Sequence, residues 1–92
     1  SGNTGADVLS NLQGVQLAWE KSKMQEYAQA KDAELANQLT KELQAVIAQA
    51  KELPTRLNDK LDDASTQEQV NKLMAAISQA FDTTEALKSK IG

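Results

Sequence analysis

The sequence predicts an all-α fold, and three features support this. Only 3% of the 92 residues are aromatic, whereas alanine, leucine, glutamine and lysine are abundant, which is typical of helices rather than of sheets. Apolar residues recur mostly at spacings of three and four, as on one face of a helix. Short polar segments around 31–33 and 62–65 separate three such stretches. We therefore expect an antiparallel three-helix bundle that runs up, down and up.

The length fits one small domain with a modest core. We interpret residues 1–5, with the sequence SGNTG, as a flexible leader or cloning scar. Residues 6–92 are then a single helical bundle domain.

The first expected helix spans about 6–31 and carries two apolar faces. One face holds Val8, Leu12, Val15 and Trp19, and the other holds Leu17, Met24 and Ala28 with Tyr27 beside them. Gly14 lies inside this helix, where we expect a small residue to let another helix come close. A second apolar face exceeds what one three-helix core covers, so we expect the chain to form a homodimer.

The second expected helix spans about 33–61, with Asp32 as its N-cap. Its apolar stripe consists of Leu35, Leu39, Leu43, Val46, Ala50, Leu53, Leu57 and Leu61. Because the stripe keeps its phase past Pro54, we expect the helix to kink there and continue, with the Ala50 carbonyl released from its usual donor. In the alternative, the helix stops and a new one starts with Pro54 as its first residue.

The third expected helix spans about 66–91. Ser65 followed by Glu68 forms a capping-box pattern, in which each side chain satisfies a backbone N–H at the helix start. The apolar positions that follow are Val70, Leu73, Met74, Ile77, Phe81, Leu87 and Ile91, with Thr84 filling a gap.

Charge and composition argue against several functions. A net charge of −3 with scattered lysines does not favour binding to nucleic acid. The chain has no histidine, the commonest general base and metal ligand, and no cysteine, so we expect neither an enzyme nor a metal or cofactor site. The lack of cysteine also leaves the redox compartment open.

The first helix holds the candidate binding residues. Trp19, Lys23 and Tyr27 follow one another at intervals of four along the expected helix, so we expect them to line a groove between helices. Such a groove could take a small organic anion, with the ammonium meeting its charge and the rings its body. In the plainer interpretation, Trp19 and Met24 belong to the core and Lys23 only extends its stem over them.

The order of these segments also resembles a known family. An apolar helix running into EYAQAKD, a Leu-striped helix ELANQLTKELQAVIAQAKEL and a capped helix with LMAAISQAFDTTEAL resemble, over about 7–91, the helical sensor regions of bacterial methyl-accepting chemoreceptors. This group includes four-helix and helical bimodular ligand-binding domains. Three helices would complete such a bundle by dimerisation.

The resemblance implies that a small organic acid or amino acid binds between helices and displaces one of them, with Lys23 where a basic residue is commonly found. It also implies a periplasmic location in a membrane-anchored receptor. The alternative function is a non-catalytic structural or adaptor bundle that mediates protein–protein interaction, and the alternative location is the cytoplasm.

Overall fold

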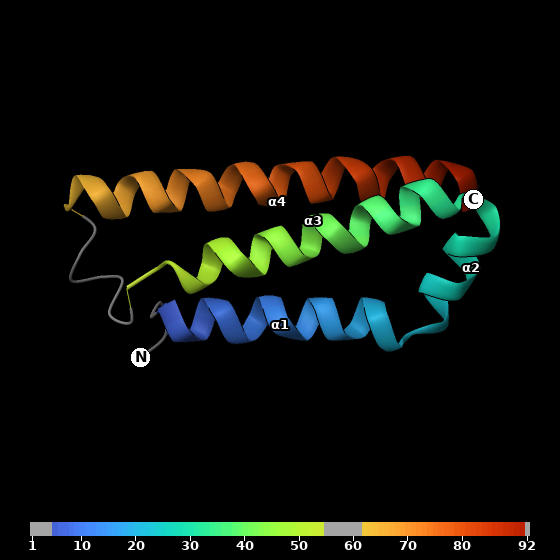
Figure 1. The fold of residues 1–92 in the computed structure, drawn as a ribbon, viewed down its shortest axis with the longest axis horizontal. Coiled ribbons are helices and arrows are strands. Elements are labelled where there is room, and N and C mark those ends of the chain that lie inside the picture. Colours follow the sequence, from blue (N-terminus) through green and yellow to red (C-terminus); the bar gives the residue numbers. More distant parts are fainter. Residues whose placement is uncertain (1–4, 55–61, 92) are drawn as a thin grey trace.

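The computed structural model describes residues 5–54 and 62–91, and these form four helices (Figure 1). They are α1 (Gly5–Lys21), α2 (Lys23–Lys31), α3 (Ala33–Lys51) and α4 (Ala64–Ile91). The all-α prediction is confirmed. Gly5, which we expected to end the leader, is instead the first residue of α1.

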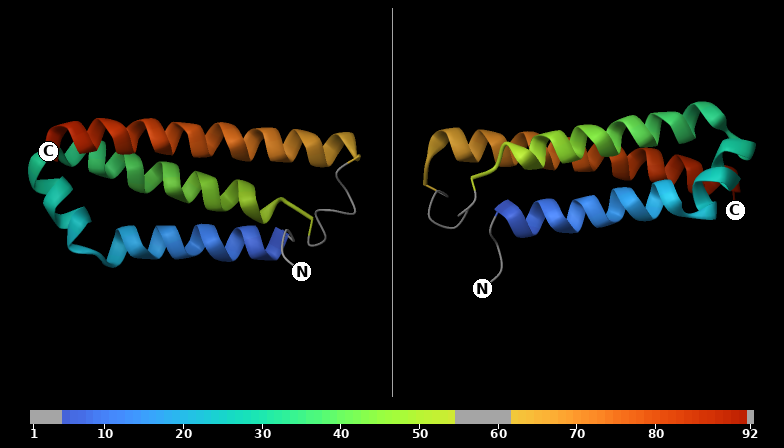
Figure 2. Two further views of the ribbon diagram at one scale, coloured as in Figure 1. Left: turned by 180° about the vertical axis from the view of Figure 1, so that it is seen from behind. Right: turned by 60° about the horizontal axis from the view of Figure 1, so that its bottom comes forward.

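The three long helices α1, α3 and α4 run up, down and up, as expected for neighbours joined by short connections (Figure 1). The short helix α2 links α1 to α3 at one end of the elongated molecule, which measures 44 × 21 × 18 Å. Seen from the front (Figure 1) and from behind (Figure 2, left), α3 lies between α1 and α4, and α3 packs on each of the other helices. The core therefore centres on α3.

The prediction of one continuous helix over 6–31 is wrong, because the chain leaves helical geometry at Ser22. This residue is extended, with φ −86° and ψ 158°; it follows α1 and occupies the N-cap position of α2, although its side chain makes no capping hydrogen bond. Its hydroxyl donates to the Trp19 carbonyl at 3.2 Å. In an unbroken helix that carbonyl would accept from the N–H of Lys23, so the serine side chain competes with the helical bond.

The expected cap of the next helix is confirmed at Asp32. Its carboxylate accepts from the Leu35 N–H at 3.1 Å, and its own N–H donates to the Ala28 carbonyl at 2.8 Å. The residue thus ends α2 and begins α3, which makes a one-residue corner. Lys90 of α4 lies 3.9 Å from the same carboxylate and ties this corner to the far end of α4.

The prediction that the second helix kinks at Pro54 and continues is also wrong. Helix α3 ends at Lys51, and the N–H groups of Glu52 and Leu53 donate to carbonyls three residues back, both at 3.1 Å. The Ala50 carbonyl is therefore not released; it accepts from Leu53. A proline disfavours helical geometry in the residue before it, which accounts for the end of the helix here. The expected continuation to residue 61, with Leu57 and Leu61, lies outside the described residues.

Helix α4 begins two residues earlier than expected, at Ala64. Asp63 supplies the cap, because its carboxylate accepts from the Ser65 N–H at 2.9 Å. Ser65 is consequently the second residue of the helix and not its N-cap. The predicted capping box is wrong, although the helix start was placed within two residues.

The core consists of buried side chains from α2, α3, the turn that follows α3, and α4. They are Ala28, Ala36, Leu39, Val46, Ile47, Ala50, Leu53, Leu73, Ala80 and Leu87. The α3 stripe is thus confirmed at its centre. On α4, however, Met74 and Phe81 remain exposed. On α2, Ala28 is fully buried, although we expected it on an outward face. Within the described part of the chain, no other helix comes within 4 Å of a Cβ built at Gly14, so the close approach expected there is not found.

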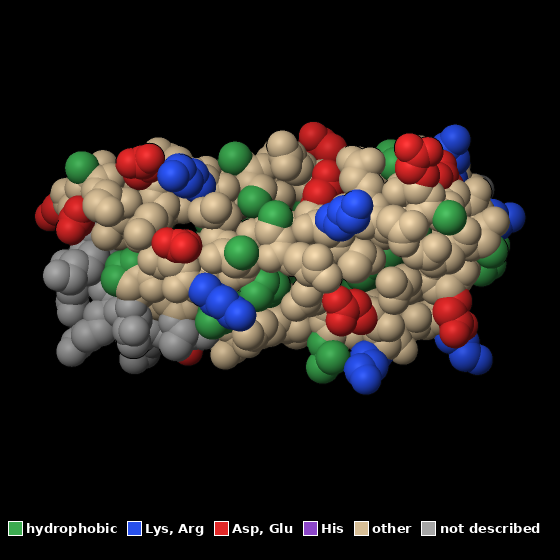
Figure 3. All heavy atoms as spheres, in the orientation of Figure 1, with side chains coloured by type: hydrophobic (Ala, Val, Ile, Leu, Met, Phe, Trp, Pro, Cys, Tyr) green, Lys and Arg blue, Asp and Glu red, His purple; other side chains and the backbone are tan. Residues whose placement is uncertain are grey.

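The molecular surface carries both signs of charge. On the face shown in Figure 3, acidic and basic side chains are interspersed, and hydrophobic groups appear between them. No helix in the described ranges is both long and apolar enough to cross a bilayer.

Candidate functional site

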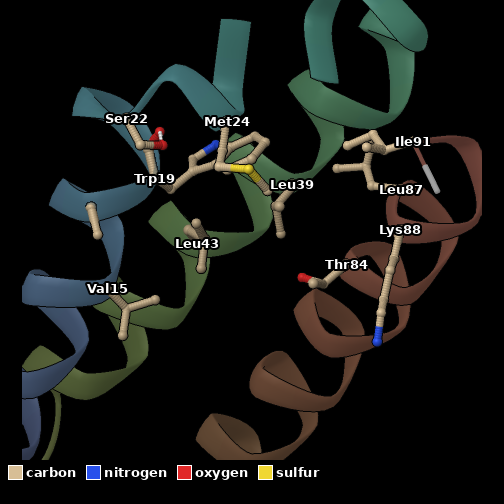
Figure 4. Close-up of a pocket in the computed structure, with 11 residues that line it drawn as sticks. Val15, Trp19, Ser22, Met24, Leu39, Leu43, Thr84, Leu87, Lys88 and Ile91 are labelled. Atoms are coloured by element: carbon tan, nitrogen blue, oxygen red, sulfur yellow. Dashed lines mark hydrogen bonds between the residues drawn. The ribbon is translucent and has the colours of Figure 1, made fainter. Parts of the chain in front are cut away.

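An open groove of about 650 Å³ lies where α1, α3 and α4 face one another next to α2 (Figure 4). Its volume is within the range of small-molecule sites. Nearly all of its wall is apolar. The lining residues are Val15, Ala18, Trp19, Ser22, Met24, Leu39, Leu43, Thr84, Leu87, Lys88 and Ile91.

The groove exists because α1 and α4 both pack on α3. Leu39 and Leu43 of α3 line it between the two outer helices (Figure 4). Val15 lies on the α1 side and keeps 55% of its surface exposed, because none of the four described helices covers it there. Burial of such apolar surface is the main favourable term in binding, so the groove is suited to an apolar molecule.

The tryptophan at the α2 end of the groove has a fixed position. Its indole N–H donates to the Thr40 hydroxyl of α3 at 2.9 Å, and Gln25 of α2 donates to the same hydroxyl at 3.4 Å. Met24 of α2 lines the groove at this end as well. One threonine on α3 therefore binds side chains from both sides of the helix break at Ser22.

Polar atoms in the groove are few, and the protein itself uses most of them. Ser22 donates to the Trp19 carbonyl at 3.2 Å, and Thr84 donates to the Ala80 carbonyl at 2.8 Å. Lys88 is the one charged residue among those that line the groove. The groove thus offers an apolar wall and a single cation.

The structure does not bring Trp19, Lys23 and Tyr27 into one site. The break at Ser22 places Trp19 on α1 and the other two on α2, so the spacing of four no longer aligns all three. Trp19 lines the groove, whereas Lys23 and Tyr27 are exposed and are not among its lining residues. The ammonium of Lys31 lies 5.5 Å from the centre of the Tyr27 ring, within cation–π range.

The sequence interpretation missed the α4 side of the groove, namely Thr84, Leu87, Lys88 and Ile91. The helical spacing places Leu87 and Ile91 on an apolar stripe in which Thr84 takes one of the apolar positions. A lysine directly after Leu87 was the available signal. It could not be interpreted without knowing that α1 leaves this side of α4 open.

Comparisons with known proteins give one match. The model of the family described as Imelysin, named Peptidase M75, matches residues 1–84. No curated protein and no solved structure matches.

The family match contradicts the chemoreceptor resemblance, together with its implications of chemotaxis and sensing. It gives no clear support to the structural or adaptor alternative either. The misleading signal was the order of amphipathic helices, which bundles of unrelated function share because the same periodicity buries one face of any helix.

Proposed function

We propose that this chain, which belongs to the Imelysin family, is a non-catalytic binding unit. Its groove would take up a small, largely apolar molecule. One observation carries the proposal: a cavity of about 650 Å³ whose lining is almost entirely aliphatic and aromatic and which is open to solvent. A ligand that covers this lining removes apolar surface from water, which favours binding by roughly 25 cal/mol per Å² before the costs of association.

The word peptidase in the family name makes peptide hydrolysis the rival proposal. We favour the non-catalytic function because the chain has neither histidine nor cysteine to act as base, nucleophile or metal ligand. In addition, no group of three or more Asp and Glu side chains within the described residues could hold a metal ion. Hydrolysis of labelled casein by the purified chain, above that of a heat-denatured sample, would favour the rival.

Trp19 provides the assay for binding, because it is the only tryptophan of the chain and it lines the groove. The neutral fluorophore N-phenyl-1-naphthylamine is titrated into the protein, and energy transfer from Trp19 is recorded. We expect saturable binding of one molecule per groove. Binding that never saturates, as for non-specific adsorption, would contradict the proposal.

A matched pair of substitutions on α1 locates the binding. Val15 lines the groove and is 55% exposed, whereas Leu17 is 54% exposed and is not among the lining residues. Val15→Asp places a charge in the apolar wall and should weaken binding at least tenfold, because desolvating an unpaired carboxylate is costly. Leu17→Asp should leave the affinity unchanged. Equal effects of both substitutions would show that the fluorophore binds elsewhere.

The periplasmic location stays a prediction, with the cytoplasm as its alternative. Fractionating cells that produce the protein and comparing its distribution with markers of each compartment would test it.

A further inference from the structure

The polar groups of the groove indicate what kind of ligand fits it. The Trp19 N–H donates to Thr40, the Ser22 hydroxyl donates to a carbonyl of α1, and the Thr84 hydroxyl donates to a carbonyl of α4. These donors are used within the protein. A ligand with several hydroxyl or amide groups, such as a sugar or a peptide, would bury them without partners, and each would cost free energy.

Lys88 is the exception. It is exposed on α4, and within the described part of the chain its ammonium has no acidic partner. The other lysines of α4 are engaged: Lys72 lies 3.4 Å from Glu68, and Lys90 lies 3.9 Å from Asp32. No acidic residue lines the groove. The lining thus combines one available positive charge with an otherwise uncharged, apolar wall.

We infer that the ligand is a free aliphatic monocarboxylate, whose carboxylate pairs with Lys88 and whose hydrocarbon chain lies along the groove between α1 and α4. This inference rests on the proposed function, and it adds the chemical class and the residue that recognises it. One cation matches one carboxylate, and an unbranched chain needs no hydrogen-bond donor from the wall. The aliphatic chain accounts for affinity and the ion pair for selectivity.

The test is displacement of N-phenyl-1-naphthylamine by three ten-carbon probes that differ in their head group. Decanoate is anionic, 1-decanol is neutral and decyltrimethylammonium is cationic; all are used below their aggregation limits. We expect decanoate to displace the fluorophore at about fivefold lower concentration than decanol, which is the size of effect that a solvent-accessible ion pair produces. The cation should be the weakest competitor. High salt should reduce the advantage of decanoate over decanol.

Lys88→Met is the informative variant, and Lys72→Met is its control because it removes the same charge from the same helix away from the groove. Circular dichroism confirms that both fold. Lys88→Met should remove the preference for decanoate over decanol, with both probes compared on the variant's own fluorophore titration. Lys72→Met should keep the preference.

The remaining outcomes show whether the carboxylate inference, the proposed apolar groove, or both fail. If the fluorophore binds but decanoate has no advantage over decanol, or Lys88→Met retains that advantage, the carboxylate inference is overturned and the apolar groove stands. If the fluorophore does not bind, both are overturned. Decanoate affinity that falls as protein concentration rises would overturn the inference too, since it would show that a second copy of the chain occupies the groove.

Discussion

The indole N–H of Trp19 on α1 donates a 2.9 Å hydrogen bond to the hydroxyl of Thr40 on α3. Gln25 of α2 donates to the same oxygen at 3.4 Å, and the Thr40 hydroxyl itself donates to the Ala36 carbonyl at 3.2 Å. One side chain therefore anchors α1 and α2 to α3 on both sides of the break at Ser22, and it holds the tryptophan that forms part of the groove.

Thr40→Val keeps the shape of the side chain and removes its hydroxyl. The indole and the Gln25 amide then lose their acceptor, so the free energy of unfolding should fall by about 1 to 2 kcal/mol. Thr84→Val is the control, because the Thr84 hydroxyl bonds only to a carbonyl of its own helix, at 2.8 Å from that of Ala80. It should change stability by less than about 0.5 kcal/mol. Urea unfolding measures both, and equal losses would contradict the anchoring role.

The two glycines of α1 should respond to alanine in opposite directions. A Cβ at Gly5 would overlap the carbonyl oxygen of Pro54, which is backbone and cannot easily move away. Gly5→Ala should therefore destabilise the fold by roughly 1 to 3 kcal/mol, as overpacking does. Gly14 faces open space, and alanine there should stabilise the helix by about 1 kcal/mol through its higher propensity. Thermal unfolding of both variants checks this, and a stabilised Gly5→Ala would mean that α1 starts away from Pro54.

The cap of α4 can be assigned by two substitutions. Asp63 accepts a 2.9 Å hydrogen bond from the Ser65 N–H, so Asp63→Ala should cost about 1 kcal/mol of stability. Ser65→Ala should cost less than about 0.5 kcal/mol, because serine is here inside the helix, where alanine has the higher propensity. Denaturant midpoints would distinguish them. If Ser65→Ala were the more damaging change, the capping box expected from the sequence would be the correct assignment.

Neighbouring residues of α4 should differ sharply in their contribution to the core. Leu73 is 5% exposed and Met74 is 60% exposed. Leu73→Ala should lower the free energy of unfolding by about 2 to 5 kcal/mol through lost burial and a remaining cavity. Met74→Ala should lower it by less than about 0.5 kcal/mol. Chemical denaturation of both variants measures the difference, and similar losses would require another rotation of α4 about its axis.

The helical fold could be predicted from the sequence because periodicity and capping are local. Asp32 caps α3 as expected, and Leu39 and Val46 are buried as the stripe indicated. The helix ends were harder to predict. At Ser22 a side-chain hydroxyl competes with a backbone hydrogen bond, and the residues around it include no glycine or proline that would mark a helix end. At Pro54 the regular apolar stripe concealed the end of α3.

The groove was less predictable than the fold. Its lining includes Trp19 of α1, Leu43 of α3 and Lys88 of α4, which are more than twenty positions apart along the chain. Their meeting depends on the rotation of each helix about its axis and on α1 and α4 both packing against α3. Neither can be derived from the spacing within one helix, which is why Lys23 was expected where the structure places Lys88.

Self-association stays a prediction, and the structure changes the surface on which it depends. Ala28 is buried, so the expected second face of the first helix is smaller, whereas Met74 and Phe81 leave an apolar edge on α4 with 60% and 62% of each residue exposed. These two are seven residues apart and so lie on the same side of the helix. An isologous dimer would pair this edge with its own copy and remove both side chains from water.

We expect light scattering to give the mass of a dimer at about 100 μM protein, with a melting temperature that rises with concentration. Phe81→Asp should give a monomer, because pairing would bury two unpaired carboxylates close to the two-fold axis. Gln79→Asp is the control: it adds the same charge at an exposed position on another side of α4 and should leave the dimer intact. A wild-type chain that scatters as a monomer and melts independently of concentration would rule out the dimer. A dimeric Phe81→Asp variant would instead move the interface to another surface, such as that around Leu17 and Tyr27.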